Sequence, residues 1–90
     1  MNANSHTKVQ IHQRGKAFVL RLEGDITSFA KESIMESYEG VPAAAARWVV
    51  LDFSKVDYLN SSGIAIVISV LKKTRGHGQG VLISGLTPHF

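Results

Sequence analysis

The sequence predicts a small α/β domain in which a mixed β-sheet is flanked by α-helices. Four short segments have the alternating or β-branched residue types of strands: 8–13, 17–22, 48–53 and 81–84. Segments with helical spacing of apolar residues precede the last two strands, which is typical of parallel strands joined by crossovers. Ninety residues with 44% hydrophobic content suit one core, so we expect one domain over residues 1–90, with residues 1–7 a flexible N-terminal segment.

The first two strands are expected to form a hairpin. Arg14-Gly15-Lys16 lies between them and supplies a glycine for the turn. Gly24-Asp25 is expected to break the second strand, because both residue types disfavour strand interiors.

The first helix is predicted from a set of residues that recur at helical spacing: Ile26, Phe29, Ala30, Ile34 and Tyr38. Thr27 or Ser28 can cap its start, and Gly40 is expected to end it. Residues 41–46 contain Pro42, which prevents simple continuation of the helix, and we interpret them as a connection.

The third strand is mostly apolar, which predicts a central strand covered on both faces, with Trp48 in the core. Residues 54–59 are expected to form a loop after it.

Residues 64–71 could form either a strand or the second helix, because their residue types have strand-like propensity. The same stretch places four aliphatic side chains on one helical face: Ile64, Val67, Ile68 and Leu71. Polar residues at 60–62 suit an N-cap, and basic residues at 72–75 before Gly76 suit a last turn, so we predict a helix.

Ile66 and Val70 would then lie towards the side or exposed face of this helix, beside Ser62. Exposed aliphatic side chains there predict a docking surface. The alternative, that a broad core face or a further helix buries both, is left open by the sequence.

Composition excludes several classes of protein. The net charge of +3 is spread along the chain without a basic stripe, so we expect no nucleic-acid partner. The chain has no cysteine, and its four histidines lack paired-ligand spacing, so we expect no metal and no cofactor. The N-terminus lacks a signal-peptide core and no apolar run is long enough for a span, which predicts a cytoplasmic protein without membrane insertion.

Chemistry is expected where the third strand leads into the second helix, at Asn60-Ser61-Ser62-Gly63-Ile64. A helix N-terminus tolerates negative charge, so a phosphate on serine can be accommodated there. Simple helix capping is the alternative. The segment is not the G-x-S-x-G elbow of hydrolases, and we expect no enzymatic activity.

This segment resembles the signature of the STAS domain of anti-sigma factor antagonists: an acidic residue, Ser, Ser or Thr, Gly and an aliphatic residue opening the second helix. Further segments resemble the family in the same order: residues 22–26, 51–54 and 83–88. The resemblance covers about residues 8–90 and implies a STAS-like fold.

In this family, the unphosphorylated antagonist binds an anti-sigma factor that is itself a serine kinase, and thereby releases a sigma factor. The resemblance implies Ser61 as the phosphoacceptor, with Ser62 as second choice, and a serine phosphatase that reverses the mark. The expected partner-binding residues are Asn60, Ser61, Ser62, Gly63, Ile66, Val70, Asp25 and Thr27.

Two positions depart from the family pattern, since Asn60 and Thr27 are neutral where the family has acidic residues. The family also normally continues past Pro88 through a helix, so we expect a fold that is short at the C-terminus or completed by a neighbouring chain. An alternative function is that of a STAS accessory subunit of a membrane transporter, such as a lipid-transport ABC system.

Overall fold

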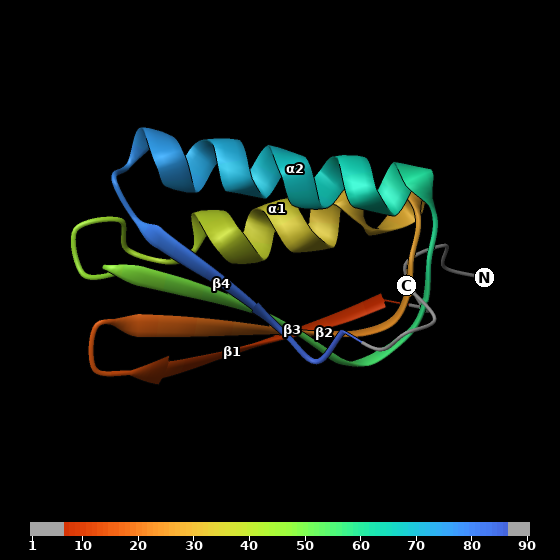
Figure 1. The fold of residues 1–90 in the computed structure, drawn as a ribbon, viewed down its shortest axis with the longest axis horizontal. Helices are drawn as coiled ribbons and strands as arrows, with labels where there is room; N and C mark the ends of the chain where they lie inside the picture. The colour runs from red at the N-terminus through yellow and green to blue at the C-terminus, as the bar shows by residue number, and fades with distance from the viewer. Residues whose placement is uncertain (1–6, 87–90) are drawn as a thin grey trace.

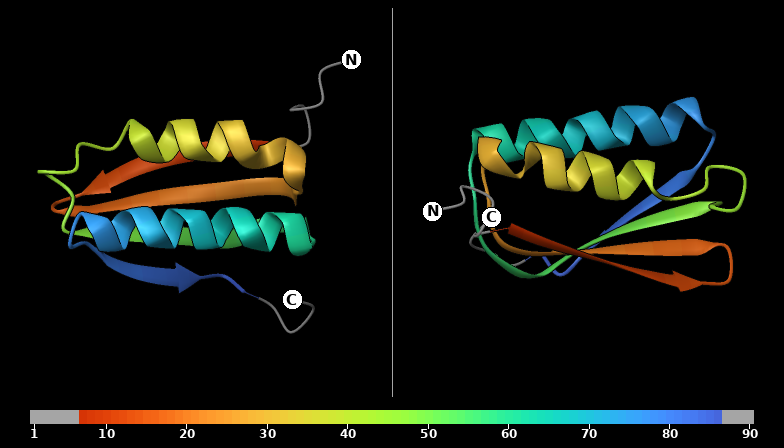
Figure 2. Two further views of the ribbon diagram at one scale, coloured as in Figure 1. Left: turned by 90° about the horizontal axis from the view of Figure 1, so that it is seen from above. Right: turned by 180° about the vertical axis from the view of Figure 1, so that it is seen from behind.

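The computed structural model describes residues 7–86, which form a four-stranded sheet with both of their α-helices on one face (Figures 1 and 2). The elements, in order, are β1 (Thr7–Arg14), β2 (Ala17–Ile26), the 3-10 turn η2 (Ser28–Ala30), α1 (Lys31–Glu39), β3 (Trp48–Leu59), α2 (Ser61–Gly76) and β4 (Gly80–Ser84). β1 is antiparallel to β2, whereas the pairs β2–β3 and β3–β4 are parallel. The predicted mixed sheet is confirmed, and no helix in this range is long and apolar enough to cross a membrane.

The core lies between the sheet and the two helices. Alternate residues of the central strands are buried there: Phe18, Leu20, Leu22, Val49, Leu51 and Phe53. The opposite face carries no helix within residues 7–86, so the prediction of a strand covered on both faces is wrong. Both crossovers run in the same direction across the sheet and share one handedness, which places both helices on the same side.

Trp48 was expected in the core but is 45% exposed. Its ring lies against Gly80, the residue with which it pairs across β3 and β4. A Cβ atom at position 80 would collide with that ring, so glycine leaves the space that the indole occupies.

β2 and β3 are longer than predicted, because they continue through Gly24-Asp25 and through residues 54–59. The pairing shifts register twice, between Arg21 and Glu23 and again between Gly24 and Asp25, and each shift gives β3 one extra residue. Such bulges bend a strand, and Figure 1 shows both strands turning towards the helices at their carboxyl ends. Gly24 makes the bend possible with a φ of 88°.

Asp52 satisfies a backbone group at the first bulge. Its carboxylate accepts a hydrogen bond of 2.9 Å from the N–H of Ser54, and Arg21 lies 3.3 Å away. The Ser54 N–H is the main cause that lowers the pKa of Asp52 below its usual 3.8; partial burial opposes it and Arg21 adds to it. The ionised carboxylate therefore stabilises the bulge, and this contribution is lost as pH falls through the lowered pKa.

The helical segment after β2 is capped by Thr27, as predicted, but its first turn is a 3-10 turn and the α-helix begins later. Ile26 ends β2, Thr27 caps η2 by accepting the Phe29 N–H at 3.4 Å, and α1 starts only at Lys31. Phe29 was predicted to share the apolar face of this helix but is 63% exposed. The other residues of that predicted face are buried: Ile26, Ala30, Ile34 and Tyr38. Gly40 ends α1 and residues 41–46 form an irregular connection, as predicted.

One end of the expected flexible segment belongs to the sheet. Thr7 starts β1, is buried, and donates its hydroxyl hydrogen bond to the carbonyl of Asp25 at 2.8 Å. The remaining residues expected to be flexible, 1–6, and the turn expected at Pro88 lie outside the described residues.

α2 is a helix, as predicted, but the side that faces the sheet is not the predicted one. Its buried residues are Gly63, Ile66, Val70 and Thr74, whereas Ile64 and Ile68 are 48% and 47% exposed. The prediction that Ile66 and Val70 form an exposed docking surface is therefore wrong. A Cβ atom on Gly63 would collide with the carbonyl oxygen of Ile26 and with Leu59. The side of α2 that carries Gly63 is therefore the side that can approach β2 closely.

We expect Gly63→Ala to lower the free energy of unfolding by about 1–3 kcal/mol, because the added methyl group must push α2 away from β2. The matched control is Gly76→Ala at the other end of the same helix, where an added Cβ meets no atom within 4 Å. That change should be neutral or stabilise by up to about 1 kcal/mol. Urea unfolding followed by circular dichroism measures both, and equal effects would show that the close approach does not seat the helix.

Candidate functional site

The carboxyl ends of β2 and β3 meet at one end of the molecule. Asp25 pairs with Tyr58 and Ile26 with Leu59, and the N–H of Asn60 donates to the carbonyl of Ile26 at 3.4 Å. This pairing brings residues 25–27 beside residues 60–63, so most of the predicted site residues share one end. Val70 does not belong to this surface, because it lies beneath α2 in the core, and Ile66 is also buried there and reaches the surface only in the hollow described below.

Asn60 is the N-cap of α2. Its side-chain oxygen accepts the N–H of Gly63 at 2.9 Å, and its backbone carbonyl accepts the N–H of Ile64 at the same distance. A neutral amide thus caps the helix, and the first turn carries no acidic residue. The positive end of the helix dipole is therefore not compensated by a carboxylate within that turn.

Ser61 and Ser62 are both exposed in the first turn of α2. The N–H groups of a first turn have no acceptor within the helix, and together with the dipole they favour an anion. A phosphate ester on either hydroxyl would lie at the helix end that tolerates negative charge.

The surroundings of the two serines differ. A shallow hollow between the two helical segments is lined by Ser28, Lys31, Ser62, Ala65, Ile66 and Ser69. Ser62 therefore lies on the α1 side of α2 and shares the hollow with Lys31. Ser61 does not line the hollow and is open to an approaching protein.

Two exposed aromatic side chains lie at the same end of the molecule. Tyr58, at the end of β3, is 53% exposed, and Phe29, in η2 next to the hollow, is 63% exposed. Aromatic side chains are enriched in protein interfaces. The sequence interpretation assigned Phe29 to the core and did not single out Tyr58, which it placed in a loop and which lies in β3, paired with Asp25.

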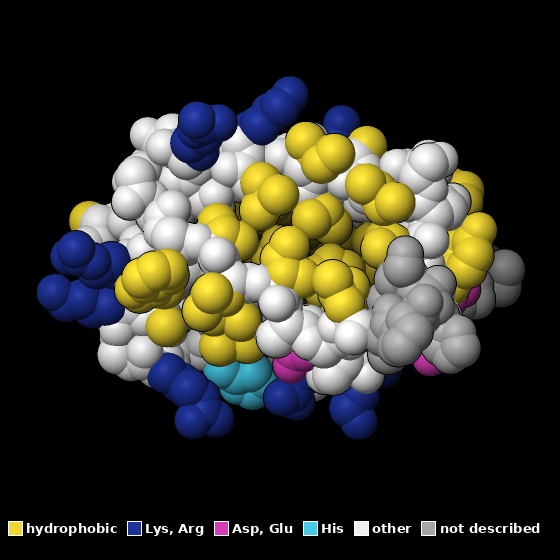
Figure 3. All heavy atoms as spheres, in the orientation of Figure 1, with side chains coloured by type: hydrophobic (Ala, Val, Ile, Leu, Met, Phe, Trp, Pro, Cys, Tyr) yellow, Lys and Arg dark blue, Asp and Glu magenta, His cyan; other side chains and the backbone are white. Residues whose placement is uncertain are grey.

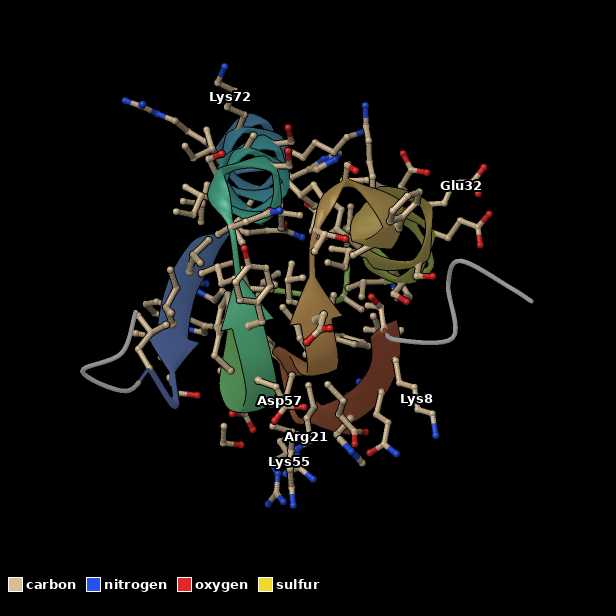
Figure 4. All side chains as sticks on the ribbon, turned by 90° about the vertical axis from the view of Figure 1, so that its right-hand side faces the viewer. Lys8, Arg21, Glu32, Lys55, Asp57 and Lys72 are labelled. Atoms are coloured by element: carbon tan, nitrogen blue, oxygen red, sulfur yellow. The ribbon has the colours of Figure 1, made fainter. Side chains whose placement is uncertain are left out.

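Figure 4 looks onto this end of the molecule and labels charged residues around it. Arg21 and Lys55 project from the open face of the sheet, opposite the helices, and Lys72 projects outward from α2. Arg21 is engaged with Asp52 at 3.3 Å. The labelled charges thus lie on the outer sides of the sheet and helices.

The fold is found in several solved structures. The antisigma-factor antagonist STAS domain from Rhodobacter sphaeroides superposes with a TM-score of 0.77 at 23% identity, over 92% of this chain and 90% of that chain. The unphosphorylated anti-sigma factor antagonist SpoIIAA gives 0.72 at 18% identity, over 91% and 76%. Mglu in its glutamate form gives 0.81 at 16% identity, over 98% of this chain and 29% of that chain.

The Mglu proteins are much larger, and this chain spans between 18% and 29% of their length. At these identities the likeness to solved structures establishes the fold. A family model described as "Mlab, STAS domain" matches residues 9–90. With the sheet topology and the Ser-Ser-Gly opening of α2, this match shows that the chain belongs to the STAS domain family.

Proposed function

We propose that this protein is an anti-sigma factor antagonist that acts by binding and is switched by phosphorylation of Ser61. In its unphosphorylated form it binds an anti-sigma factor that is also a serine kinase, and this binding releases a sigma factor. The kinase then modifies Ser61, and a serine phosphatase restores the binding form. The observation that carries the proposal is the exposed Ser61 hydroxyl at the uncompensated N-terminus of α2.

The switch can act without unfolding the domain. A phosphate adds about −1.5 to −2 charges at neutral pH, and the helix N-terminus is favourable for it. Core residues of α2 lie on another side of the helix and keep their contacts. The fold therefore tolerates the modification.

The complex with the partner, in contrast, should not tolerate phosphorylation of Ser61. Tyr58 and Phe29 are exposed at the same end of the molecule as Ser61, and exposed aromatic rings favour a desolvated contact with a partner. A charged phosphate buried in such a contact without a matching cation is costly, so the complex should dissociate.

Ser61 is preferred over Ser62 on local grounds as well as by family resemblance. A phosphate on Ser62 would lie in the hollow beside Lys31, whose ammonium group could neutralise part of its charge. A phosphate on Ser61 would face the partner directly.

The alternative function is that of a STAS accessory subunit of a membrane transporter. The neutral side chains of Asn60 and Thr27, where the family's antagonists are acidic, favour this reading, because a permanent binding module needs no phosphotransfer. In that case the same end of the molecule would be a constitutive contact surface.

Incubation of the protein with ATP and a lysate of its own cells, followed by peptide mass spectrometry, tests the switch. We expect phosphate on Ser61 in the wild type and none in Ser61→Ala. Absence of phosphate on both serines, while a control substrate is modified, together with copurification of a membrane ATPase, would favour the transporter alternative.

Binding by Ser61 variants gives a second test, using the partner captured with unphosphorylated protein. Ser61→Ala should bind like the wild type, and Ser61→Asp should bind at least about tenfold more weakly, about 1.4 kcal/mol. Ser84→Asp introduces the same charge at an exposed position of β4 and should have no effect. Equal affinities of the two Ser61 variants in titration calorimetry would contradict the switch.

Asn60 variants separate capping from phosphotransfer. Asn60→Ala should lower the free energy of unfolding by about 0.5–2 kcal/mol through loss of the cap, whereas Asn60→Asp should be close to the wild type. We expect Asn60→Asp to accept phosphate on Ser61 faster, because it restores the family's acidic residue. An unchanged initial rate would show that the neutral side chain does not limit phosphotransfer.

A further inference from the structure

The face of the sheet opposite the helices carries an aromatic ring that is open to solvent. Trp48 is 45% exposed, and it is the only tryptophan of the chain. Its side chain shares this face with Ala17 and Gly80, its partners on the two neighbouring strands. Both partners are small, so neither strand supplies a side chain large enough to cover the ring.

The ring of Trp48 lies flat on the sheet. A Cβ atom at position 80 would collide with Cε3 and Cζ3 of the ring, and Cη2 would lie only 2.9 Å from it. A ring that met Gly80 with its edge would hold the third of these atoms farther away. One face of the ring therefore covers Gly80, and the opposite face meets solvent.

Basic residues gather around the ring from two separate parts of the chain. Arg14 lies in the same row of the sheet, because it pairs with Ala17, which pairs with Trp48. The carbonyl oxygen of Lys16, in the hairpin turn, accepts the N–H groups of Arg47 and Trp48 at 2.8 and 3.1 Å. The three basic residues are exposed, and none of them forms a salt bridge within the described part of the chain.

Within the described residues, no carboxylate belongs to this end of the sheet. Residues 8–22 and 40–51, which include most of β1 and the first residues of β2 and β3, contain no aspartate or glutamate. The first acidic residue along β3 is Asp52, about 13 Å from Trp48 and engaged with Arg21.

Figure 3 shows the resulting charge distribution on one face of the molecule. Lys and Arg side chains surround its left end, where Figure 1 places the hairpin turn and the start of β3, without an Asp or Glu side chain among them. Cations that are scattered in the sequence thus form a cluster in the fold. We call Trp48 with Arg14, Lys16 and Arg47 the Trp48 surface.

The Trp48 surface lies away from both ends of the described chain. Thr7 pairs with Gly24, and Ser84 pairs with Asp52, so both terminal segments leave the sheet beyond these pairs (Figure 2). Trp48 begins β3, whereas Ser61 follows its other end. An inference about the Trp48 surface therefore does not rest on the phosphorylation switch.

We propose that the Trp48 surface binds single-stranded nucleic acid. An unpaired base stacks on the open face of the ring, and the neighbouring phosphates lie next to Arg14, Lys16 and Arg47. Exposed aromatic side chains on an open four-stranded sheet hold single strands in this way, and stacking tolerates any base sequence. The sequence predicted no nucleic-acid partner because it has no basic stripe, whereas the fold brings the basic residues together around an aromatic ring.

The flat ring favours nucleic acid over a membrane surface. A tryptophan that anchors a protein in lipid buries its ring among the headgroups and has to project from the protein, whereas this ring lies against Gly80. Charge argues against a second copy of this chain. A two-fold contact would bring the same cations together with no carboxylate of this surface between them.

Titration of the full-length protein with a single-stranded oligonucleotide of about ten nucleotides tests the proposal. Because Trp48 is the only tryptophan, its fluorescence reports on the contact, and we expect quenching when a base stacks on the ring. An abasic strand of the same length carries the phosphates without bases. It should cause no quenching and bind at least about tenfold more weakly.

Variants separate stacking from charge, with binding followed by the fluorescence anisotropy of a labelled strand and folding checked by circular dichroism. Trp48→Leu should weaken binding at least about tenfold, and Trp48→Phe, which keeps a ring, should bind more tightly than Trp48→Leu. Arg14→Glu should weaken binding and reduce its dependence on salt.

Lys55→Glu is the matched control for Arg14→Glu, because it makes the same change of charge on the same face of the sheet. Lys55 lies about 20 Å along β3 from Trp48, more than two Debye lengths at physiological salt, so binding should stay close to that of the wild type.

Three results would overturn the proposal. Equal binding of the base-bearing and abasic strands with unchanged tryptophan fluorescence would show that only charge is recognised. Equal losses in Arg14→Glu and Lys55→Glu would place binding elsewhere. A shift of the Trp48 emission to shorter wavelength with vesicles of equal parts phosphatidylcholine and phosphatidylserine, without quenching by the oligonucleotide, would identify a lipid-binding surface instead.

Discussion

The close contact between the first turn of α2 and the end of β2 determines how the rest of this structure is arranged. Gly63 lies so near the carbonyl of Ile26 that no side chain fits between them. Because α2 is a single rigid helix, this contact sets the rotation of all its residues about the helix axis. Ile66 and Val70 are thereby turned into the core, and Ser61 is turned outward.

The same rotation divides α2 into surfaces with different roles. One side packs on the sheet, the N-terminal end presents two hydroxyls, and the β4 side presents aliphatic groups to solvent. Small domains bury a limited share of their surface, and exposed apolar patches on them mark contact sites.

Helix capping by Asn60 connects stability with the proposed switch. Its amide satisfies the N–H of Gly63 without adding charge, so the helix end stays electropositive. The fold then gains from a negative group at Ser61, whereas a partner packed against Tyr58 and Phe29 would lose contact energy.

The order of strands and helices, the hairpin turn, the capping of α2 and the family could all be predicted from the sequence, because these depend on residue types close together in the chain. The sequence also identified the apolar stripe of α2, but periodicity cannot tell which of two adjacent apolar sides faces the core. That choice depends on the fit of Gly63 against Ile26 and Leu59, a contact between separate elements. The exposure of Trp48 likewise depends on tertiary structure, because both helices cover the same face of the sheet and leave the face that carries its side chain open.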